Sequence, residues 1–428
     1  MRIAISGASG FVGKRLSTYF QEKGYEIVSL NRTIIQDSEK LIDALSGCQA
    51  VINLAGANIN QTWTFEHKRE MYNSRIEITC NLVNAINALH VKPEVFISAS
   101  AVGYYPNKGF YDEYSMQKGD GFLSDLCKDW EDEAGKINNK TRLVITRLGI
   151  VLSPYGGAFP KMFSTLKFKF ATVVGTGQQM FPWIDIRDLV RAMEYVMQTS
   201  SITGVVNFVA PQQLTQYQLA ERVAHHYKCL LKVGIPEFIL KYKFGEASDF
   251  LLKGQCVIPT RLIKSDFTYL SPNIDQFLDT PDRTTVDKVD LKRYLGKWYE
   301  IARYDHRFER DLTHVTAQYY LELDGTIKVE NKGVDPSSGK EKRAMGMAVL
   351  NSPGKLKVSF FPGISADYFI LELDQENYSY ALIGSRSNKY LWILSRTPQL
   401  PDAAKRHLLQ CAERRGYDIS QLIWVEQA

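Results

Sequence analysis

The sequence predicts a doubly wound parallel α/β domain, followed by an all-β barrel of eight antiparallel strands with one helix. The first observation is a regular alternation of β-branched runs with helical patterns, from residue 1 to about residue 270. The second is a change, beyond about residue 284, to closely spaced strand patterns with turn signals between them. The third is the length, because 428 residues exceed what one hydrophobic core usually supports.

The first domain is expected to span residues 1–279 and to end in a small α/β extension. In it, apolar runs of strand length alternate with amphipathic runs of helix length. The strand-like runs are residues 2–6, 26–30, 50–54, 94–98 and 142–147, and the helix-like runs are 12–23, 39–45 and 70–89. Residues 280–284 are rich in turn formers and poor in apolar side chains, so we expect a linker there.

The second domain is expected to span residues 285–428. Short strands in meander order, joined by turns such as Asp324-Gly325, favour an antiparallel barrel. A single helix is expected at 401–415, because a proline stands at its start and Gly416 just beyond its end. The expected strands are 298–304, 315–323, 326–330, 344–350, 355–361, 368–373, 378–383 and 390–395.

Composition and charge exclude several classes of protein. The net charge of +5 is small for this length, and no run of like charges forms a basic stripe, so a nucleic-acid partner is not expected. The longest apolar stretches are far shorter than the roughly 20 residues of a membrane-spanning helix. The first strand leads at once into a glycine-rich turn and leaves no room for a secretion signal. The six cysteines show neither a CxxC pair nor a metal-binding spacing. We therefore expect reduced thiols, no metal and a cytoplasmic location.

A glycine-rich turn, Gly7-Ala-Ser-Gly-Phe-Val-Gly13, lies between the first strand and the first helix. In this context the first glycine allows a tight turn, the second lets the backbone approach a pyrophosphate, and the third lets helix and strand pack closely. The phosphates of a dinucleotide would lie at the helix N-terminus. A tight turn without a ligand is the alternative. The residues expected to contact the cofactor here are Gly7, Ser9, Gly10, Phe11, Val12 and Gly13.

The end of the second strand bears on the choice between NADP and NAD. It reads Ser29-Leu-Asn-Arg32, where NAD-binding sites usually place a carboxylate for the ribose 2′-hydroxyl. An arginine favours the 2′-phosphate of NADP, although Arg32 can also be a solvated surface charge, so NAD stays the less favoured alternative. The third strand ends in a small loop that could pass close to the adenosine. The residues expected there are Leu54, Ala55 and Gly56.

Six segments of the first domain carry a family resemblance when taken together. They are Gly7 to Gly13, Asn53-Leu-Ala-Gly56, Ser98-Ala-Ser-Ala-Val-Gly-Tyr-Tyr105, Thr146-Arg-Leu-Gly149, Gly156-Gly-Ala158 and Trp183-Ile-Asp-Ile-Arg-Asp188. Residues 1 to about 278 resemble the extended short-chain dehydrogenase/reductase superfamily, in the branch described as sugar-nucleotide epimerases. The resemblance implies a Rossmann-like fold, a nicotinamide cofactor and a small-molecule substrate.

The resemblance also implies positions for catalytic residues. In the superfamily a serine near the end of the fourth strand binds the substrate carbonyl or hydroxyl, and Ser100 occupies that place. A tyrosine follows closely at Tyr104 and is the candidate acid, with packing or cofactor stacking as the alternative. Ser100 and Tyr104 are therefore the expected catalytic residues.

The usual Tyr-x-x-x-Lys pair of the superfamily is not found on the following helix. That pair works because residues four apart share a helix face, so that the lysine lowers the pKa of the tyrosine. When the helix is aligned on Trp130-Glu131, Leu123 and Cys127 stand at the two positions. A literal match at 114–118 lies in a polar stretch typical of a loop. Cofactor binding is thus better supported than any particular reaction.

The second domain carries a separate resemblance. Its segments are Gly296-Lys-Trp-Tyr-Glu-Ile-Ala-Arg-Tyr304, Phe308-Glu-Arg310, Lys357-Val-Ser-Phe-Phe-Pro362 and Tyr390-Leu-Trp-Ile-Leu-Ser-Arg-Thr-Pro398. From about Val286 onward the chain resembles the bacterial lipocalins. The resemblance implies that Arg396 packs over Trp298 at the closed end of the barrel, and that the barrel binds a small apolar or lipid-like ligand.

Two functions follow from these domains. The first is an NADP-dependent oxidoreductase or epimerase-like enzyme, fused to a lipocalin that holds an apolar ligand. The second is a noncatalytic protein that senses NADP(H) and carries a lipid, which the missing Tyr-x-x-x-Lys pair supports. The sequence leaves the substrate, the barrel ligand and the oligomeric state open.

Overall fold

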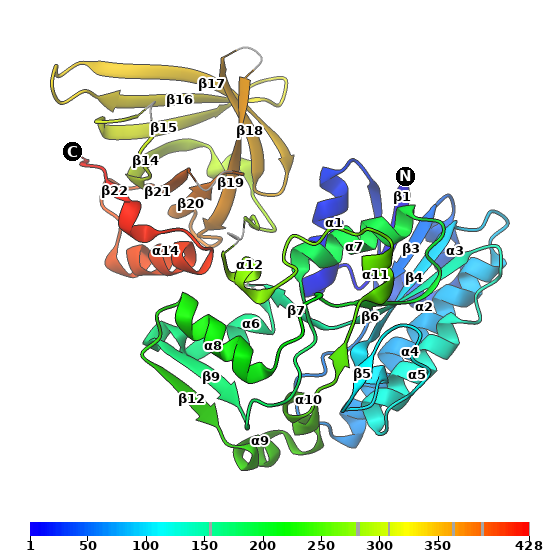
Figure 1. The fold of residues 1–428 in the computed structure, drawn as a ribbon. Coiled ribbons are helices and arrows are strands. Elements are labelled where there is room, and N and C mark those ends of the chain that lie inside the picture. Colours follow the sequence, from blue (N-terminus) through cyan, green and yellow to red (C-terminus); the bar gives the residue numbers. More distant parts are fainter. Residues whose placement is uncertain (154–155, 280–282, 307–308, 362–363, 387–388, 428) are drawn as a thin grey trace. The chain divides into compact units, whose positions relative to one another are not determined.

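The computed structural model shows two compact units, Met1–Asp279 and Thr280–Ala428 (Figure 1). The expected linker at 280–284 falls in part outside the described residues. The structure describes residues 1–427 with five internal gaps, namely 154–155, 280–282, 307–308, 362–363 and 387–388.

The first unit is built on a six-stranded sheet with the order β2-β1-β3-β4-β6-β11, in which every neighbouring pair is parallel. β2 lies on one side of β1, and all later strands lie on the other side. Dinucleotides bind where the strand order reverses in this way, outside the carboxyl ends of the strands. The strands are β1 (Arg2–Ser6), β2 (Glu26–Leu30), β3 (Ala50–Asn53), β4 (Val95–Ala101), β6 (Arg142–Leu148) and β11 (Gly204–Phe208).

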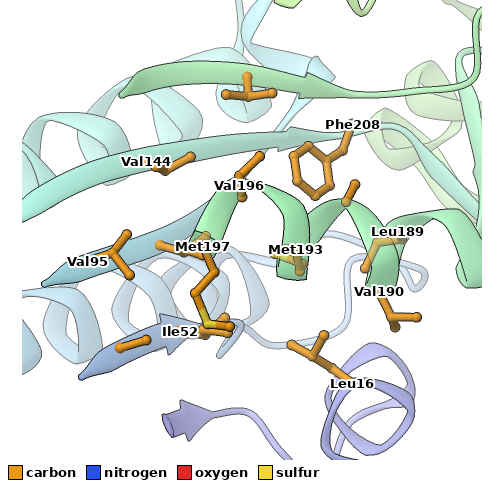
Figure 2. Packing of buried hydrophobic residues seen from close by; sticks show 14 of the residues in the cluster. Leu16, Ile52, Val95, Val144, Leu189, Val190, Met193, Val196, Met197 and Phe208 are labelled. Atoms are coloured by element: carbon orange, nitrogen blue, oxygen red, sulfur yellow. The ribbon is translucent and has the colours of Figure 1, made fainter. Parts of the chain in front are cut away.

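Helices cover both faces of this sheet, which confirms the predicted doubly wound architecture. Leu16 of one helix and Leu189 and Met193 of another pack against Ile52, Val144 and other strand residues in one core (Figure 2). A second core lies on the opposite face of the sheet. The helices of the first face are α1 (Phe11–Glu22) and α7 (Ile186–Gln198), and those of the second are α2 (Arg32–Gln36), α3 (Ser38–Leu45), α4 (Phe65–Ala88) and α5 (Phe122–Ala134).

Short elements between and after these strands complete the first unit, including the expected α/β extension. The short strands are β5 (Phe110–Tyr111), β7 (Ile150–Ser153), β8 (Gly156–Gly157), β9 (Phe170–Val174), β10 (Trp183–Asp185), β12 (Leu231–Ile235) and β13 (Cys256–Val257). The helices are α6 (Phe159–Met162), α8 (Gln216–His226), α9 (Glu237–Phe244), α10 (Asp249–Leu252), α11 (Thr260–Lys264) and α12 (Ile274–Asp279), with 3-10 turns η1 (Val102–Tyr104), η2 (Ser164–Phe168) and η3 (Gly245–Ser248).

The second unit is a closed antiparallel barrel. Its first strand, β14, pairs with both β15 and β21, so the eight strands form a ring, and a two-residue strand, β22, adds to β14. The strands are β14 (Gly296–Arg303), β15 (Thr313–Leu321), β16 (Ile327–Val334), β17 (Glu341–Ser352), β18 (Lys355–Phe361), β19 (Ile364–Leu373), β20 (Tyr380–Gly384), β21 (Leu391–Ser395) and β22 (Ile423–Trp424). The helices are α13 (Leu291–Tyr294), α14 (Asp402–Arg414) and the 3-10 turn η4 (Ile419–Gln421).

Two hydrophobic layers distinguish the inside of the barrel from its outside. One cluster draws residues from strands all around the ring, including Trp298, Val329 and Ile383, and lies on the inner side of the barrel. The other joins strand residues such as Leu371 to Leu408 of α14. The long helix therefore packs against the outer surface of the barrel.

Several elements differ in extent from the expectations. α4 begins at Phe65 rather than at residue 70, because Thr64 caps it by accepting a hydrogen bond from the His67 backbone N–H. β16 and β17 run further than their apolar patterns, and their backbones pair as far as Val334 opposite Glu341. The residues added at the start of β17, Glu341 to Arg343, are charged and exposed, so hydrophobic alternation does not mark them.

Candidate cofactor and active site

The glycine turn lies where the strand order reverses. Gly7 has a left-handed backbone (φ +69°), and a Cβ there would lie 2.8 Å from the Leu54 carbonyl after β3. A Cβ at Gly13 would lie 2.1 Å from the Gly7 oxygen, so only glycine allows α1 to begin this close to the turn. The first and third glycines thus bring β1, α1 and the end of β3 together, as the sequence predicts.

The N-terminus of α1 is open to a ligand. Gly10 is the N-cap residue and has no side chain to cap the first turn, which also lacks an acidic residue. A Cβ at Gly10 would come near only the Gly7 oxygen, at 3.2 Å, and Ser9 and Gly10 are exposed. Uncapped N–H groups at a helix N-terminus attract anions such as phosphate.

Phe11 and Val12 form the first turn of α1, and Phe11 is packed on one side. A Cβ at Gly156 would come within 2.4 Å of the Phe11 ring, so the two glycines of β8 lie against that ring. Phe11 is 39% exposed, and its remaining surface faces solvent. Its ring therefore borders the turn instead of entering the core.

Arg32 stands at the first position of α2, directly after β2, and is exposed. The neighbouring Asn31 caps this helix, because its side chain accepts a hydrogen bond of 2.9 Å from the Ile34 backbone N–H. Within the described part of the chain, no hydrogen bond or ion pair is formed by the Arg32 side chain. This guanidinium is therefore available to an anion beside the strand end.

Leu54, Ala55 and Gly56 continue β3 past the glycine turn. The Leu54 N–H donates to the Ser6 backbone oxygen at 3.2 Å, which fixes this segment to the end of β1. A Cβ at Gly56 would lie 2.9 Å from the Arg75 guanidinium carbon. The loop thus passes next to the turn, and its third residue has to be small because an arginine packs on it.

Ser100 belongs to a buried polar cluster. It is 2% exposed, and its hydroxyl donates a hydrogen bond of 2.6 Å to Glu131 Oε1 on α5. Arg147 on β6 donates to both oxygens of the same carboxylate, from Nε at 2.8 Å and from Nη2 at 2.7 Å. Burial opposes the charge on Arg147, but hydrogen bonds and attraction from Glu131 raise its pKa above the usual value.

Tyr104 joins this cluster from η1. The Arg147 guanidinium carbon lies 3.5 Å from the centre of the Tyr104 ring and 4.7 Å from that of Tyr105. The Tyr105 hydroxyl is committed to the core, where it donates to the Asp112 carbonyl and lies 3.0 Å from Asn207 Oδ1. Ser100 and Tyr104, predicted together, therefore contact the same Glu131–Arg147 ion pair.

Two lysines near this cluster are held mainly by aspartates. The pKa of Lys118 is raised first by its hydrogen bond to Asp125, and that of Lys128 first by its hydrogen bond to Asp132, while Tyr104 adds a smaller attraction in each case. Both ammonium groups thus form ion pairs with these aspartates.

Leu123 and Cys127, which stand where the Tyr-x-x-x-Lys pair is expected, lie close to Gly103 in the turn that follows Ser100. A Cβ at Gly103 would lie 3.7 Å from Leu123 Cβ and 4.0 Å from Cys127 Sγ, both on α5. Burial raises the pKa of the Cys127 thiol to about 11, so it stays protonated at neutral pH. The literal match at Tyr114 lies outside any helix, and its ring is 60% exposed.

The roles of Glu131 and Arg147 were not anticipated from the sequence. In the sequence, Glu131 is only a residue on which the helix α5 is aligned, and Arg147 is one residue of a segment that carries the family resemblance. One signal could have found them, since an arginine within a buried strand requires a carboxylate partner.

The barrel closes at one end as the resemblance implies. The Arg396 guanidinium lies 3.9 Å from the centre of the Trp298 ring, and it donates hydrogen bonds to the Lys297 and Arg293 carbonyls. Trp298 is fully buried, and its Nε1 donates to the Tyr294 carbonyl. These residues hold the end of the barrel. Phe308 and Pro362, also part of the resemblance, lie outside the described residues.

A polar cluster lies at the other end of β14. Arg303 donates to Glu300 at 2.8 Å, while His306 lies 2.9 Å from Glu309. Burial and the charge of Glu309 raise the pKa of Glu300 well above its usual value, and the Arg303 guanidinium acts in the opposite direction. Arg303 Nε, His306 Nδ1 and Asn331 Oδ1 are buried without a hydrogen-bond partner in the described structure. Such atoms favour a polar group brought in by a ligand.

Comparison with known protein families agrees with the two units. The NAD dependent epimerase/dehydratase family matches residues 3–208, and a domain of unknown function, DUF1731, matches residues 235–280. The lipocalin-like domain matches residues 289–427. Among the described residues, no helix combines the length and apolar character needed to cross a membrane.

Individual relatives match one unit each. Epimerase family protein SDR39U1 homolog, chloroplastic, of Arabidopsis thaliana is 31% identical over 289 residues, which cover 63% of this chain and 83% of that protein. The crystal structure of human epimerase family protein SDR39U1 (isoform 2) with NADPH shares 30% identity at a TM-score of 0.61, covering 65% of this chain and 98% of that chain. Outer membrane lipoprotein Blc of Escherichia coli (strain K12) is 48% identical over 153 residues, covering 35% of this chain and 86% of that protein.

Proposed function

The chain belongs to the NAD dependent epimerase/dehydratase family through its first unit and to the lipocalin-like family through its second, and from this premise we propose an NADP-dependent enzyme fused to a binding barrel. The reaction is an oxidation, reduction or epimerisation at a carbonyl or secondary alcohol. The observation that carries the proposal is the open, uncapped start of α1 between the glycine turn and Arg32.

The residues of this turn fit a dinucleotide. A side chain at Gly10 would occupy the space through which a pyrophosphate reaches the first N–H groups of α1. The N–H groups of Phe11 and Val12, with the Ser9 hydroxyl, would bind the phosphates. Leu54, Ala55 and Gly56 would line the adenosine side, because they continue the neighbouring strand. The turn can therefore accept the dinucleotide in the conformation that it has in this structure.

NADP is the form that these residues favour. Arg32 offers an unpaired guanidinium next to the end of β2, where a 2′-phosphate would lie. Ser29 to Arg32 contains no carboxylate to accept a bond from the 2′-hydroxyl of NAD. The human relative was solved with NADPH, which supports the same choice.

Ser100 would bind the substrate oxygen, and Glu131 would accept its proton. The bound nicotinamide supplies or accepts hydride. Ser100 can accept a hydrogen bond from a substrate hydroxyl while its own proton is donated to Glu131. A proton that leaves the substrate thus has a path through Ser100 to a carboxylate that Arg147 holds in place. Tyr104 is the second candidate for proton transfer, because its ring packs 3.5 Å from the Arg147 guanidinium of the same cluster.

Turnover distinguishes this enzyme from a noncatalytic NADP(H) sensor. Single-turnover absorbance of NADPH should fall when the protein is mixed with an accepted member of a panel of small carbonyl compounds. Ser100→Ala should slow this step by about tenfold or more, since it removes the donor and acceptor at the reacting oxygen, while NADPH affinity stays the same. Ser98→Ala, two residues earlier on β4, is the matched control and should keep the rate.

The sensor is the alternative, and the missing Tyr-x-x-x-Lys pair is the feature that favours it. Tight NADPH binding with no consumption by any compound in the panel would contradict the enzyme. A Ser100→Ala rate equal to that of Ser98→Ala would contradict the role of Ser100 instead.

The barrel would bind a small apolar ligand with a polar end. Its interior is lined by aliphatic and aromatic residues, and the unpartnered polar atoms of Arg303, His306 and Asn331 lie at one end. This arrangement suits a lipid-like molecule whose polar group replaces the missing hydrogen bonds. We extend the proposal to a cytoplasmic location, which cell fractionation can check and which is supported by the six cysteines, none of them in a disulfide within the described residues.

A further inference from the structure

Three potential metal ligands meet between α14 and β19 on the outer side of the barrel. Glu372 comes from β19, and His407 and Cys411 come from α14. The two helix residues are four positions apart, so they share the face that packs on the barrel. Ligand atoms of all three side chains lie within 4.8 Å of one another. Residues far apart in the sequence thus place a carboxylate, an imidazole and a thiol at one point.

The distances between these atoms are close to those of a tetrahedral metal site. His407 Nε2 lies 3.8 Å from Glu372 Oε1 and 3.7 Å from Cys411 Sγ. With metal bonds of about 2.0 Å to nitrogen or oxygen and 2.3 Å to sulfur, the corresponding edges of a tetrahedron are roughly 3.3 to 3.5 Å. The two edges at His407 thus exceed these values by about half an ångström at most, and the third edge, between Glu372 and Cys411, is no longer than 4.8 Å. The 3.7 Å contact of His407 with Cys411 is a hydrogen bond to sulfur, whereas the 3.8 Å between His407 and Glu372 is longer than a direct hydrogen bond.

The kind of ligand points to zinc. A thiolate with an imidazole and a carboxylate is the mixed set that Zn²⁺ and its substitute Co²⁺ accept, whereas Ca²⁺ and Mg²⁺ require oxygen ligands. The thiolate and the carboxylate together balance the two positive charges of the ion. Three protein ligands leave a fourth position for water or an external group.

The surroundings support the carboxylate and leave the site accessible. Arg415 Nη2 lies 3.9 Å from Glu372 Oε2, so the guanidinium attracts the oxygen that does not face His407. The Tyr380 ring packs against the His407 ring at 6.1 Å. Cys411 is 2% exposed, but the His407 side chain is 44% exposed, so an ion can enter from solvent on the histidine side.

We propose that Glu372, His407 and Cys411 form a three-ligand zinc site that fastens α14 to the barrel. The ion replaces the proton of the thiol, which passes to solvent, and no electron is transferred. Because the metal binds only when helix and strand are docked, it stabilises the folded second unit. This site could not be predicted from the sequence, since the ligands follow no known spacing and come from separate elements.

Cobalt titration of the reduced full-length chain tests the site. One equivalent of Co²⁺ should produce a thiolate-to-cobalt charge-transfer band, and Zn²⁺ should displace it and raise the melting temperature. His407→Ala and Glu372→Gln should each weaken Co²⁺ binding by at least about tenfold, because each removes a direct ligand. Cys411→Ser should abolish the band. His314→Ala in the same barrel and Cys229→Ser in the first unit are the matched controls and should bind as the unaltered protein does.

Three results would overturn the proposal. One is the absence of a band in the unaltered chain. Another is a band that persists in Cys411→Ser, which would place the thiolate elsewhere. The third is unchanged Co²⁺ affinity in both His407→Ala and Glu372→Gln. His407 is partly exposed, so its variant keeps the test valid even if the buried cysteine variant fails to fold.

Discussion

Ser98 and Ser100 lie two residues apart on β4, and both are buried, but their hydroxyls differ in their partners. Ser98 Oγ has no hydrogen-bond partner in the described structure, whereas Ser100 Oγ donates to Glu131 at 2.6 Å. Glu131 in turn holds Arg147, whose side chain is only 5% exposed. The two serines therefore give a matched pair in which one hydroxyl belongs to an ion-pair network and the other does not.

This difference predicts an order of stabilities. Glu131→Gln should lower the free energy of unfolding by about 3 kcal/mol, because it leaves the buried Arg147 charge without its carboxylate. Ser100→Ala should cost about 1 kcal/mol, the value of one hydrogen bond, and Ser98→Ala should cost less. Denaturant titration, followed at the transition of the first unit, measures the change in unfolding free energy for all three variants. A Glu131→Gln cost no larger than that of Ser98→Ala would show that the ion pair does not stabilise the fold.

Individual elements show why much of the fold could be predicted. β1 and β2 have the expected bounds, because each is a short, largely apolar run enclosed by turn residues. The glycine turn was predictable because the spacing of its three glycines between a strand and a helix is visible in the sequence, although Gly7 also has to be small because it packs against Leu54. α14 also begins and ends where a proline and a glycine indicate, with Gly416 in a left-handed conformation at φ +82°.

Other elements depend on contacts that a local pattern does not contain. β17 extends to polar, exposed residues that are ordered by pairing with β16, not by burial. The Ser100–Glu131–Arg147 network joins β4, α5 and β6, and none of the three residues indicates the other two from its position in the sequence. Likewise, the three ligands between β19 and α14 meet only after the helix has packed. Sites of this kind follow from tertiary structure, so the sequence alone points to the glycine turn but not to these clusters.

At the scale of the whole molecule, each unit has its own hydrophobic cores. We propose that residues 1–279 and 285–428 fold separately and are joined by a linker, whose polar composition supports this division. Limited proteolysis with mass analysis should show first cleavage between residues 280 and 284. The two fragments, produced separately, should each unfold cooperatively at the temperature seen in the full chain. An insoluble barrel fragment would contradict independent folding.

We propose that the first unit binds NADP through the glycine turn and Arg32. NADPH and NADH can be titrated against the unaltered chain, Arg32→Asp and Arg406→Asp. Arg406 is an exposed arginine of the barrel helix, so its variant gives the same change of charge and serves as the control. Arg32→Asp should weaken NADPH binding by on the order of tenfold or more and shift the preference toward NADH, while Arg406→Asp should change neither. Equal NADPH affinity in all three proteins would show that Arg32 does not bind the 2′-phosphate.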